Sequence, residues 1–266
     1  MISEIAINNY KSILYQRFAV ARVNVFFGRG GSGKTNLLEA VGMAAAAHDD
    51  ASDTGNLLKR GIRATIPSLM FHAPRGKEQD KAIIINWCER NSLKKATLVC
   101  ENPEDKNTSW KDISWYEPDY IARVNDLISF ISNGTIEAQY PFADQTKNRV
   151  LNAAFRGSRS FRDYMIFKSL TEKNIWKLLT DNAPPAFFAI DNIETLLTPD
   201  ICSSVINDIS PMAEKHNKQV LITTSQPSII HGMNPDDTAL KLFLLERTDE
   251  GQTIVKEVTN KASIDI

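Results

Sequence analysis

Apolar and polar residues follow two different periods along this chain of 266 residues, and the periods predict a mixture of strands and helices. Residues 2–7 carry an interrupted alternating pattern that predicts a first strand, and the Val- and Phe-rich run at 18–27 predicts a second. Glycines interrupt the chain at 28–33, and residues 36–47 are then apolar at the density of a helix. This part of the chain therefore predicts the order strand, glycine loop, helix.

The remaining chain continues the same mixture. Three short strands, which we expect to pair as an antiparallel patch, are predicted at 81–87, 95–101 and 109–115. Residues 119–131 and most of 145–180 carry helical patterns. Further along, the pattern predicts a strand at 186–190, a helix at 199–216, a strand at 219–223, a short helix at 228–231 and a hairpin at 240–246 and 253–258. The alternation predicts an α/β fold with a mixed sheet.

The composition of the chain adds no further structural element, but it excludes several classes of protein. The 31 basic and 32 acidic residues give a net charge of −1, which excludes a protein that coats nucleic acid by bulk charge but not a local basic patch. Cys88, Cys100 and Cys202 are scattered and odd in number, so we expect a reducing, cytoplasmic environment without a disulfide framework. Neither a signal peptide nor a membrane-spanning helix is predicted.

One segment carries a specific chemical pattern, G-x4-G-K-[ST]. Its residues are Gly28, Arg29, Gly30, Gly31, Ser32, Gly33, Lys34 and Thr35. Glycines let backbone N–H groups turn inward around phosphate oxygens, Lys34 would reach the β and γ phosphates, and the Thr35 hydroxyl would ligate Mg²⁺. The helix that begins there points its positive end at the same anion. A glycine turn without a ligand is the alternative, and the strand–loop–helix context argues against it.

A second motif follows much later in the chain. The apolar strand at 186–190 ends in Asp191, where P-loop proteins place the carboxylate that holds Mg²⁺. The alternative is that Asp191 only caps the turn after the strand. The long separation from the glycine loop leaves room for an inserted lobe. We therefore expect one domain, with a nucleotide-binding core at 1–50 and 183–266 and a β/helical lobe at 51–182.

These motifs in this order resemble the ATP-binding heads of the ABC superfamily, in the branch of RecF, Rad50 and SMC proteins that includes bacterial AAA-family ATPases of phage-defence loci. The segments that carry the resemblance are 5–12, 28–40, 187–199 and 219–224. The resemblance implies a P-loop head that binds ATP and Mg²⁺, with Lys11, Ser12 and Asn36 near the nucleotide. The chain has no sustained heptads, so we expect no coiled-coil arms.

The chain departs from the family pattern at groups that support hydrolysis. Most heads carry Glu where this chain has Asn192, which can orient water but cannot accept its proton; losing a general base costs about 10²–10⁴-fold in rate. Glu194 is the nearby carboxylate that we consider as a substitute. Ser225 stands at the position of the switch histidine and does not titrate near neutral pH. In addition, Gly30 replaces an Asn of the loop. We expect retained ATP binding and weak or partner-dependent hydrolysis.

Family heads dimerise, with each ATP held between one phosphate loop and the signature segment of the partner. The best candidate for that segment here is Gly157, Ser158 and Arg159, followed by a helical run at 161–170. A plain helix N-cap by Ser158 is equally compatible with the pattern. The resemblance thus implies an ATP-dependent homodimer or higher oligomer.

Basic residues also gather between 145 and 168. They are Lys147, Arg149, Arg156, Arg159, Arg162 and Lys168. A solvated helix face, a phosphate contact across a dimer and a nucleic-acid backbone track all fit this cluster. By family analogy, a head without arms acts on a companion effector such as a nuclease or toxin. A head that drives a partner, a non-hydrolysing ATP-gated scaffold and a DNA-binding RecF-like repair ATPase all remain open.

Overall fold

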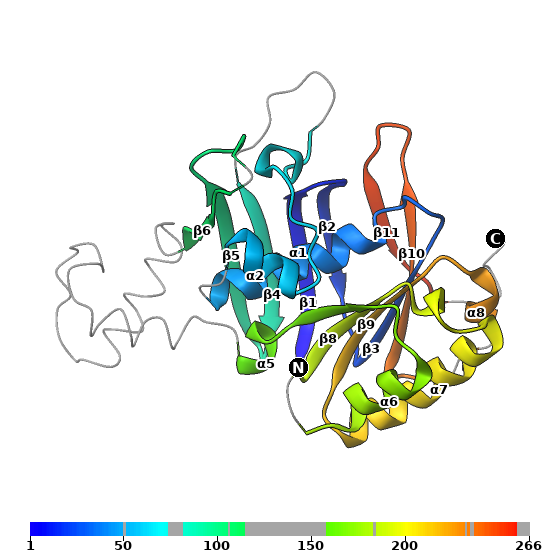
Figure 1. Ribbon diagram of the computed structural model, residues 1–266. Coiled ribbons are helices and arrows are strands. Elements are labelled where there is room, and N and C mark those ends of the chain that lie inside the picture. The colour runs from blue at the N-terminus through cyan, green and yellow to red at the C-terminus, as the bar shows by residue number, and fades with distance from the viewer. Residues whose placement is uncertain are drawn as a thin grey trace.

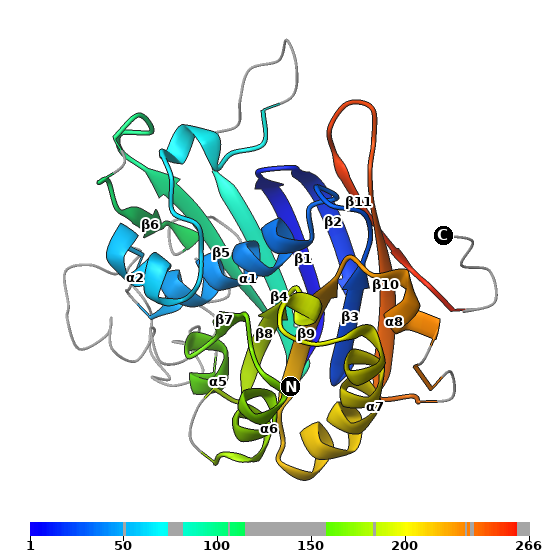
Figure 2. The same ribbon diagram turned by 45° about the vertical axis from the view of Figure 1, so that its right-hand side comes forward.

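Two sheets, with helices between and beside them, make up the part of the chain that the computed structural model describes (Figures 1 and 2). The described residues are 1–49, 52–73, 82–105, 107–114, 158–182, 185–231, 233–234 and 237–259. The predicted helix at 119–131 lies outside them. The predicted α/β class with a mixed sheet is confirmed.

The first sheet has five strands in the order β2-β1-β4-β5-β6, and all its neighbours are antiparallel. Its strands are β1 (Ile2–Tyr10), β2 (Ile13–Ala19), β4 (Ile83–Glu89), β5 (Ser92–Cys100) and β6 (Trp110–Asp112). The three short strands predicted after residue 80 are thus confirmed. They continue directly from β1, so the N-terminal strand and the middle of the chain share one sheet.

The second sheet has six strands in the order β11-β10-β3-β9-β8-β7. Its strands are β3 (Val23–Phe27), β7 (Met165–Lys168), β8 (Phe187–Asp191), β9 (Gln219–Thr224), β10 (Leu240–Arg247) and β11 (Thr253–Glu257). β11 pairs antiparallel with β10, and all other neighbours are parallel. The central strands β3, β8 and β9 are buried along their whole length, which explains why their sequences are mainly apolar without an alternating pattern.

Helix α1 (Lys34–His48) lies between the two sheets, and all its residues except Thr35 and Asn36 are buried. Burial on every side explains why α1 is apolar all round rather than striped. α6 (Glu172–Thr180), α7 (Pro199–Lys215) and α8 (Pro227–His231) pack on the opposite face of the six-stranded sheet. Short helices α2 (Thr54–Lys59) and α5 (Arg159–Arg162) lie near the end of α1.

An aromatic cluster joins the two sheets on the α1 side. The ring of Phe18 in β2 lies 5.7 Å from Phe26 in β3 and 5.6 Å from Phe243 in β10, and the last two rings stack at 4.9 Å. Such pairs contribute about 0.5–1.5 kcal/mol beyond their buried area. The sheets are therefore packed together next to the strand that leads into the glycine loop.

One predicted element is wrong, and another is interrupted. The run at 18–27 is not one strand, because it leaves β2 and enters β3 in the other sheet. Asn24 holds that turn, since its Oδ1 accepts from the N–H of Ala21 at 2.8 Å and its Nδ2 donates to the oxygen of Ala21 at 2.9 Å. The described part of 145–180 is mainly helical, as predicted, but the strand β7 separates α5 from α6.

No coiled-coil arm occurs among the described residues, where the longest helix is α7 with 17 residues. None of the helices described here is both long enough and apolar enough to cross a membrane.

Candidate functional site

The glycine loop connects β3 to α1, and glycine is required at its two ends. A Cβ on Gly28 would lie 2.2 Å from the backbone oxygen of Leu245. Gly33 has a φ of 103°, and a Cβ there would lie 2.0 Å from Oγ1 of Thr253. At Gly30, in contrast, a Cβ would meet nothing within 4 Å. Strands β10 and β11 therefore require glycine at both ends of the loop, whereas Gly30 has room for a side chain.

The same hairpin forms hydrogen bonds with the middle of the loop. Arg247 donates from Nη1 to the backbone oxygen of Gly31 at 3.0 Å, and Thr253 donates from Oγ1 to the oxygen of Ser32 at 2.9 Å. The hydroxyls of Thr253 and Ser12 lie 2.7 Å apart. Ser12, near the N-terminus of the chain, is thus linked to the loop through a residue of β11.

Lys34 is the first residue of α1, and its ammonium folds back over the loop. Nζ donates to the backbone oxygens of Gly28 at 2.6 Å and Arg29 at 3.0 Å. Burial lowers the pKa of Lys34, while the charges of Glu194 and Asp191 act in the opposite direction. The ammonium is therefore held at the loop by two carbonyl groups that a phosphate can replace.

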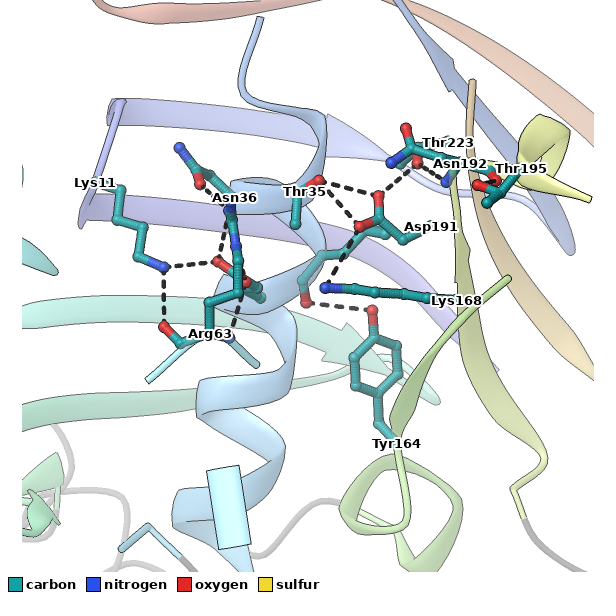
Figure 3. A network of polar contacts seen from close by, with 12 residues as sticks. Lys11, Thr35, Asn36, Arg63, Tyr164, Lys168, Asp191, Asn192, Thr195 and Thr223 are labelled. Atoms are coloured by element: carbon teal, nitrogen blue, oxygen red, sulfur yellow. Dashed lines mark hydrogen bonds and ion pairs between the residues drawn. The ribbon is translucent and has the colours of Figure 1, made fainter. Parts of the chain in front are cut away.

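Asp191, at the end of β8, meets side chains from three other elements (Figure 3). Oγ1 of Thr35 in α1 lies 3.0 Å from both carboxylate oxygens. Thr223 in β9 donates from Oγ1 to Oδ1 at 2.7 Å. Nζ of Lys168 in β7 lies 3.8 Å from Oδ2. The structure thus brings together the two residues that we expect to hold Mg²⁺, Thr35 and Asp191.

The three candidate catalytic residues follow Asp191 and β9. Asn192 has a φ of 54°, a left-handed conformation that Asn tolerates, and its N–H donates to Oγ1 of Thr223 at 2.8 Å. This turn places Glu194 against the end of β9, where its Oε1 accepts from the N–H of Ser225 at 2.9 Å. The Ser225 side chain itself is exposed. The charge of Glu194 acts on Lys34 together with that of Asp191, whereas Asn192 carries no charge.

A second polar cluster lies beside the loop, around the fully buried Glu39 of α1. Its carboxylate accepts from Nζ of Lys11 at 2.7 Å and from the N–H and Nε of Arg63 at 2.9 and 2.7 Å. Asn36 joins the cluster to the loop, because it accepts from Arg63 at 2.9 Å and donates to Oγ of Ser12 at 2.8 Å. Figure 3 shows Lys11 and Arg63 converging on α1 from two sides.

The residues present fit ATP and Mg²⁺. Among the described residues, Oγ of Ser32 and Oε2 of Glu194 are buried without a hydrogen-bond partner. Unsatisfied buried polar atoms cost about 1–3 kcal/mol each. A phosphate at the loop would accept from the Ser32 hydroxyl, whereas the Glu194 oxygen is an acceptor and requires a donor such as water. The hydroxyl of Thr35 and the carboxylate of Asp191 are the hard oxygen donors that Mg²⁺ prefers.

The predicted signature segment forms the start of α5. Oγ of Ser158 accepts from the N–H of Phe161 at 3.3 Å, so Ser158 is the N-cap. The side chain of Arg159 is 82% exposed and lies 3.5 Å from Asp163. Gly157 falls outside the described residues. Ser158 is therefore an N-cap, and the contact of this segment with a partner's nucleotide stays a prediction.

The helical run predicted at 161–170 is wrong, because α5 ends at Arg162 and β7 follows. β7 is parallel to β8, and its last residue, Lys168, is level with Asp191. The helix that leads into β8 is α6, capped by Thr171, whose Oγ1 accepts from the N–H of Asn174 at 3.4 Å. α6, not α5, therefore starts near the C-terminal ends of the strands, where Asp191 also lies.

The basic cluster is divided in the described structure. Arg159 faces solvent, whereas Nε of Arg162 is buried and Lys168 lies at the candidate site. The other members fall outside the described residues: Lys147, Arg149 and Arg156. One continuous basic face is thus not formed by the three members that are described.

Together, the two sheets, the glycine loop and α1 give this chain the α/β fold of SMC head domains. The SmcHead bound to the C-winged helix domain of ScpA has the same fold: it aligns over 99% of both chains at 13% identity with a TM-score of 0.51. The SMC head domain from Thermotoga maritima aligns over 97% of this chain and 98% of its own at 10% identity (TM-score 0.49). RecF with ATP aligns over 97% and 99% at 11% identity (TM-score 0.45). No protein-family model and no curated protein matches the sequence.

Proposed function

We propose that this chain is an ATP-binding ABC-type head that associates with itself when ATP and Mg²⁺ are bound. The contact between Thr35 and Asp191, across 156 residues, carries the proposal because it places metal-binding oxygens against the phosphate loop. In this proposal the nucleotide is bound by residues 28–36 together with Lys11 and Ser12. The proposed core at 1–50 and 183–266 then supplies most of the site, and the proposed lobe at 51–182 adds Lys168 through β7.

The chemistry follows from the positions of the charges. Lys34 exchanges the two loop carbonyls for phosphate oxygens, and the backbone N–H groups of the loop complete the cradle. Mg²⁺, when bound, offsets the phosphate charge. Glu194 has a carboxylate oxygen without a partner and is the group that accepts a proton from water, while Asn192 orients that water.

Hydrolysis in this site is slow. Asn192 supplies no carboxylate directly after Asp191, and Glu194 is tied to the backbone at Ser225 by one of its two oxygens. The same observation favours the second candidate function, a non-hydrolysing scaffold in which ATP acts only as a switch. Both functions need the same bound nucleotide and differ only in whether it is turned over.

For the isolated protein we therefore expect a turnover well below about 1 per second, the lower end of ordinary enzyme rates. Phosphate release with saturating ATP and Mg²⁺ measures it, and the Lys34→Ala variant corrects for contaminating ATPases. Turnover well above that value would show that Glu194 is a fully effective base. Turnover equal to that of Lys34→Ala would favour the scaffold.

We also propose that the head acts on a protein partner, such as a nuclease or toxin effector in bacterial anti-phage defence. The SMC head that shares this fold is bound to a winged-helix domain of another protein, which supports a partner of some kind. The effector itself rests on the family resemblance. DNA binding through residues between 147 and 162 remains the alternative for a RecF-like role.

Light scattering with and without ATP–Mg²⁺ tests the central proposal. The wild-type chain of 29.8 kDa is expected to double in mass when ATP is added. Lys34→Ala is expected to weaken ATP binding about 10- to 150-fold, the effect of losing a charged hydrogen bond, and to stay at the mass of one chain. Lys173→Ala, which removes an exposed lysine of α6, is the matched control.

If ATP causes no assembly of the wild type, the dimer is wrong. If Lys34→Ala assembles as readily as the wild type, the glycine loop is not the site that drives assembly.

A further inference from the structure

Lys168 is the residue of the candidate site that neither motif explains. It ends β7, and its Cα is paired in register with that of Asp191 in the parallel strand β8. Side chains at paired positions of neighbouring strands point to the same face of a sheet. In Figure 3 the Lys168 side chain passes below Asp191, while Thr35 and Thr223 approach the carboxylate from above.

The two hydroxyls and the ammonium play different parts at Asp191. Thr35 and Thr223 donate hydrogen bonds but bring no charge. The side chain of Asp191 is only 2% exposed, and a buried carboxylate requires a counter-charge. Lys168 supplies a positive charge at 3.8 Å, which is ion-pair distance without a tight hydrogen bond.

Lys168 is also partly open to solvent. Its side chain is 40% exposed, and a long lysine side chain can carry its ammonium to water. Lys34 differs in this respect, because it is buried and donates to two loop carbonyls. Lys34 is thus an enclosed cation at the loop, and Lys168 is a partly exposed cation beside the carboxylate of Asp191.

We propose that Lys168 is a resident cation that stands in for the divalent metal beside Asp191. This inference rests on the proposed ATP binding. With Lys168 in place, the site binds the triphosphate of a nucleotide without a divalent metal. Mg²⁺ has to displace the ammonium from Asp191, and Lys168 then turns to solvent. Lys168 is therefore a phosphate-binding residue in the absence of Mg²⁺, as well as a partner of the carboxylate.

The dissociation constant of ATP, measured by calorimetry in Mg²⁺ and in EDTA, tests this inference. For the wild type, EDTA is expected to weaken binding by less than about fivefold, because one charged contact, worth tenfold or more, is kept. Lys168→Met keeps the length of the side chain and removes its charge. It is expected to bind about tenfold or more weakly than the wild type in EDTA, and equally well or better in Mg²⁺.

Two further variants distinguish the effect of the Lys168 charge on ATP binding from an effect on folding. Lys168→Arg keeps the charge and is expected to keep the small effect of EDTA, whereas Lys173→Met changes an exposed lysine in the first turn of α6 and is expected to change nothing. A merely structural ion pair would lower the melting temperature of Lys168→Met but would leave the ratio of the two dissociation constants unchanged.

Wild-type binding alone can overturn the inference. If EDTA weakens wild-type binding about 100-fold or more, the ammonium does not replace the metal, and the proposed ATP binding still stands. If EDTA weakens ATP binding equally in the wild type and in Lys168→Met, the inference about Lys168 is likewise wrong. If the wild type binds no ATP in either solution, the proposed function fails and this inference fails with it.

Discussion

Replacing Glu39 by alanine is expected to lower the free energy of unfolding by about 3–5 kcal/mol, because it breaks a buried ion pair and leaves a cation without its partner. Glu39 is fully buried, and the Lys11 side chain that it holds is only 14% exposed. The N–H and Nε of Arg63 lose the same acceptor. Equilibrium unfolding in urea measures the change as a lower midpoint at an unchanged slope.

Arg63→Ala is the matched control for this variant. The Arg63 side chain is 57% exposed, so its ion pair with Glu39 is screened by water, and its loss is expected to cost about 1 kcal/mol or less. If Glu39→Ala costs no more than Arg63→Ala, then Glu39 is not the buried anchor of Lys11 and of the loop beside it.

The pH dependence of the difference between wild type and Glu39→Ala provides a second measurement. Burial alone would raise the pKa of the Glu39 carboxyl, but hydrogen bonds and charge from Arg63 and Lys11 outweigh it and the pKa is lowered. A lowered pKa in the folded state stabilises the protein above the pKa of the unfolded chain, about 4.3 for Glu. The stabilisation is lost as the pH falls through the folded-state pKa. The difference in the free energy of unfolding between the wild type and Glu39→Ala is therefore expected to become smaller in acid.

Gly28→Ala is the second change with a large expected effect, a loss of about 2–5 kcal/mol in the free energy of unfolding. The new Cβ would lie 2.2 Å from the backbone oxygen of Leu245 in β10, so a strand rather than a side chain has to move. Overpacking of this kind costs about 1–3 kcal/mol, and the displaced strand adds lost contacts. Thermal unfolding in the absence of nucleotide measures the loss without any effect of binding.

Gly30→Ala is the control from the same loop. Nothing lies within 4 Å of a Cβ at this position, so we expect a change within about 0.5 kcal/mol, as for other open surface positions. The family carries Asn at this position, and the structure has room for a side chain there. Equal losses for Gly28→Ala and Gly30→Ala would mean that the loop is sensitive to any substitution and not to its contact with β10.

The fold was predictable where an element carries its own signal in the sequence. α1 is apolar at helical density and follows a glycine loop, and β8 is a short apolar run that ends in an acid. The run at 18–27 was predicted as one strand because its residues are apolar throughout most of its length. It in fact contributes to β2 in one sheet and β3 in the other, and the side chain of Asn24 holds the turn between them. β7 was missed because four residues are too few to establish a strand period.

Some residues of the candidate site were likewise predictable from the sequence and others were not. Lys34, Thr35 and Asp191 lie in motifs whose spacing is local, so their roles could be proposed from the sequence. Contacts made by Lys168 and Thr253 depend on strand register and on the packing of a distant hairpin, which no local pattern encodes. One signal was present: Glu39 is an acid inside an apolar helix, and such a residue requires a basic partner, although the sequence does not say which.

The hairpin that supports the loop has a consequence for the order of events during synthesis. The glycine motif is made early, but the surfaces that shape it at Gly28 and Gly33 belong to Leu245 and Thr253, more than 200 residues later. A growing chain that has emerged only as far as β9 has the motif without its support. Under the proposed function, nucleotide can therefore stabilise this protein only after β11 has been translated, and every earlier stage of folding has to proceed without that stabilisation.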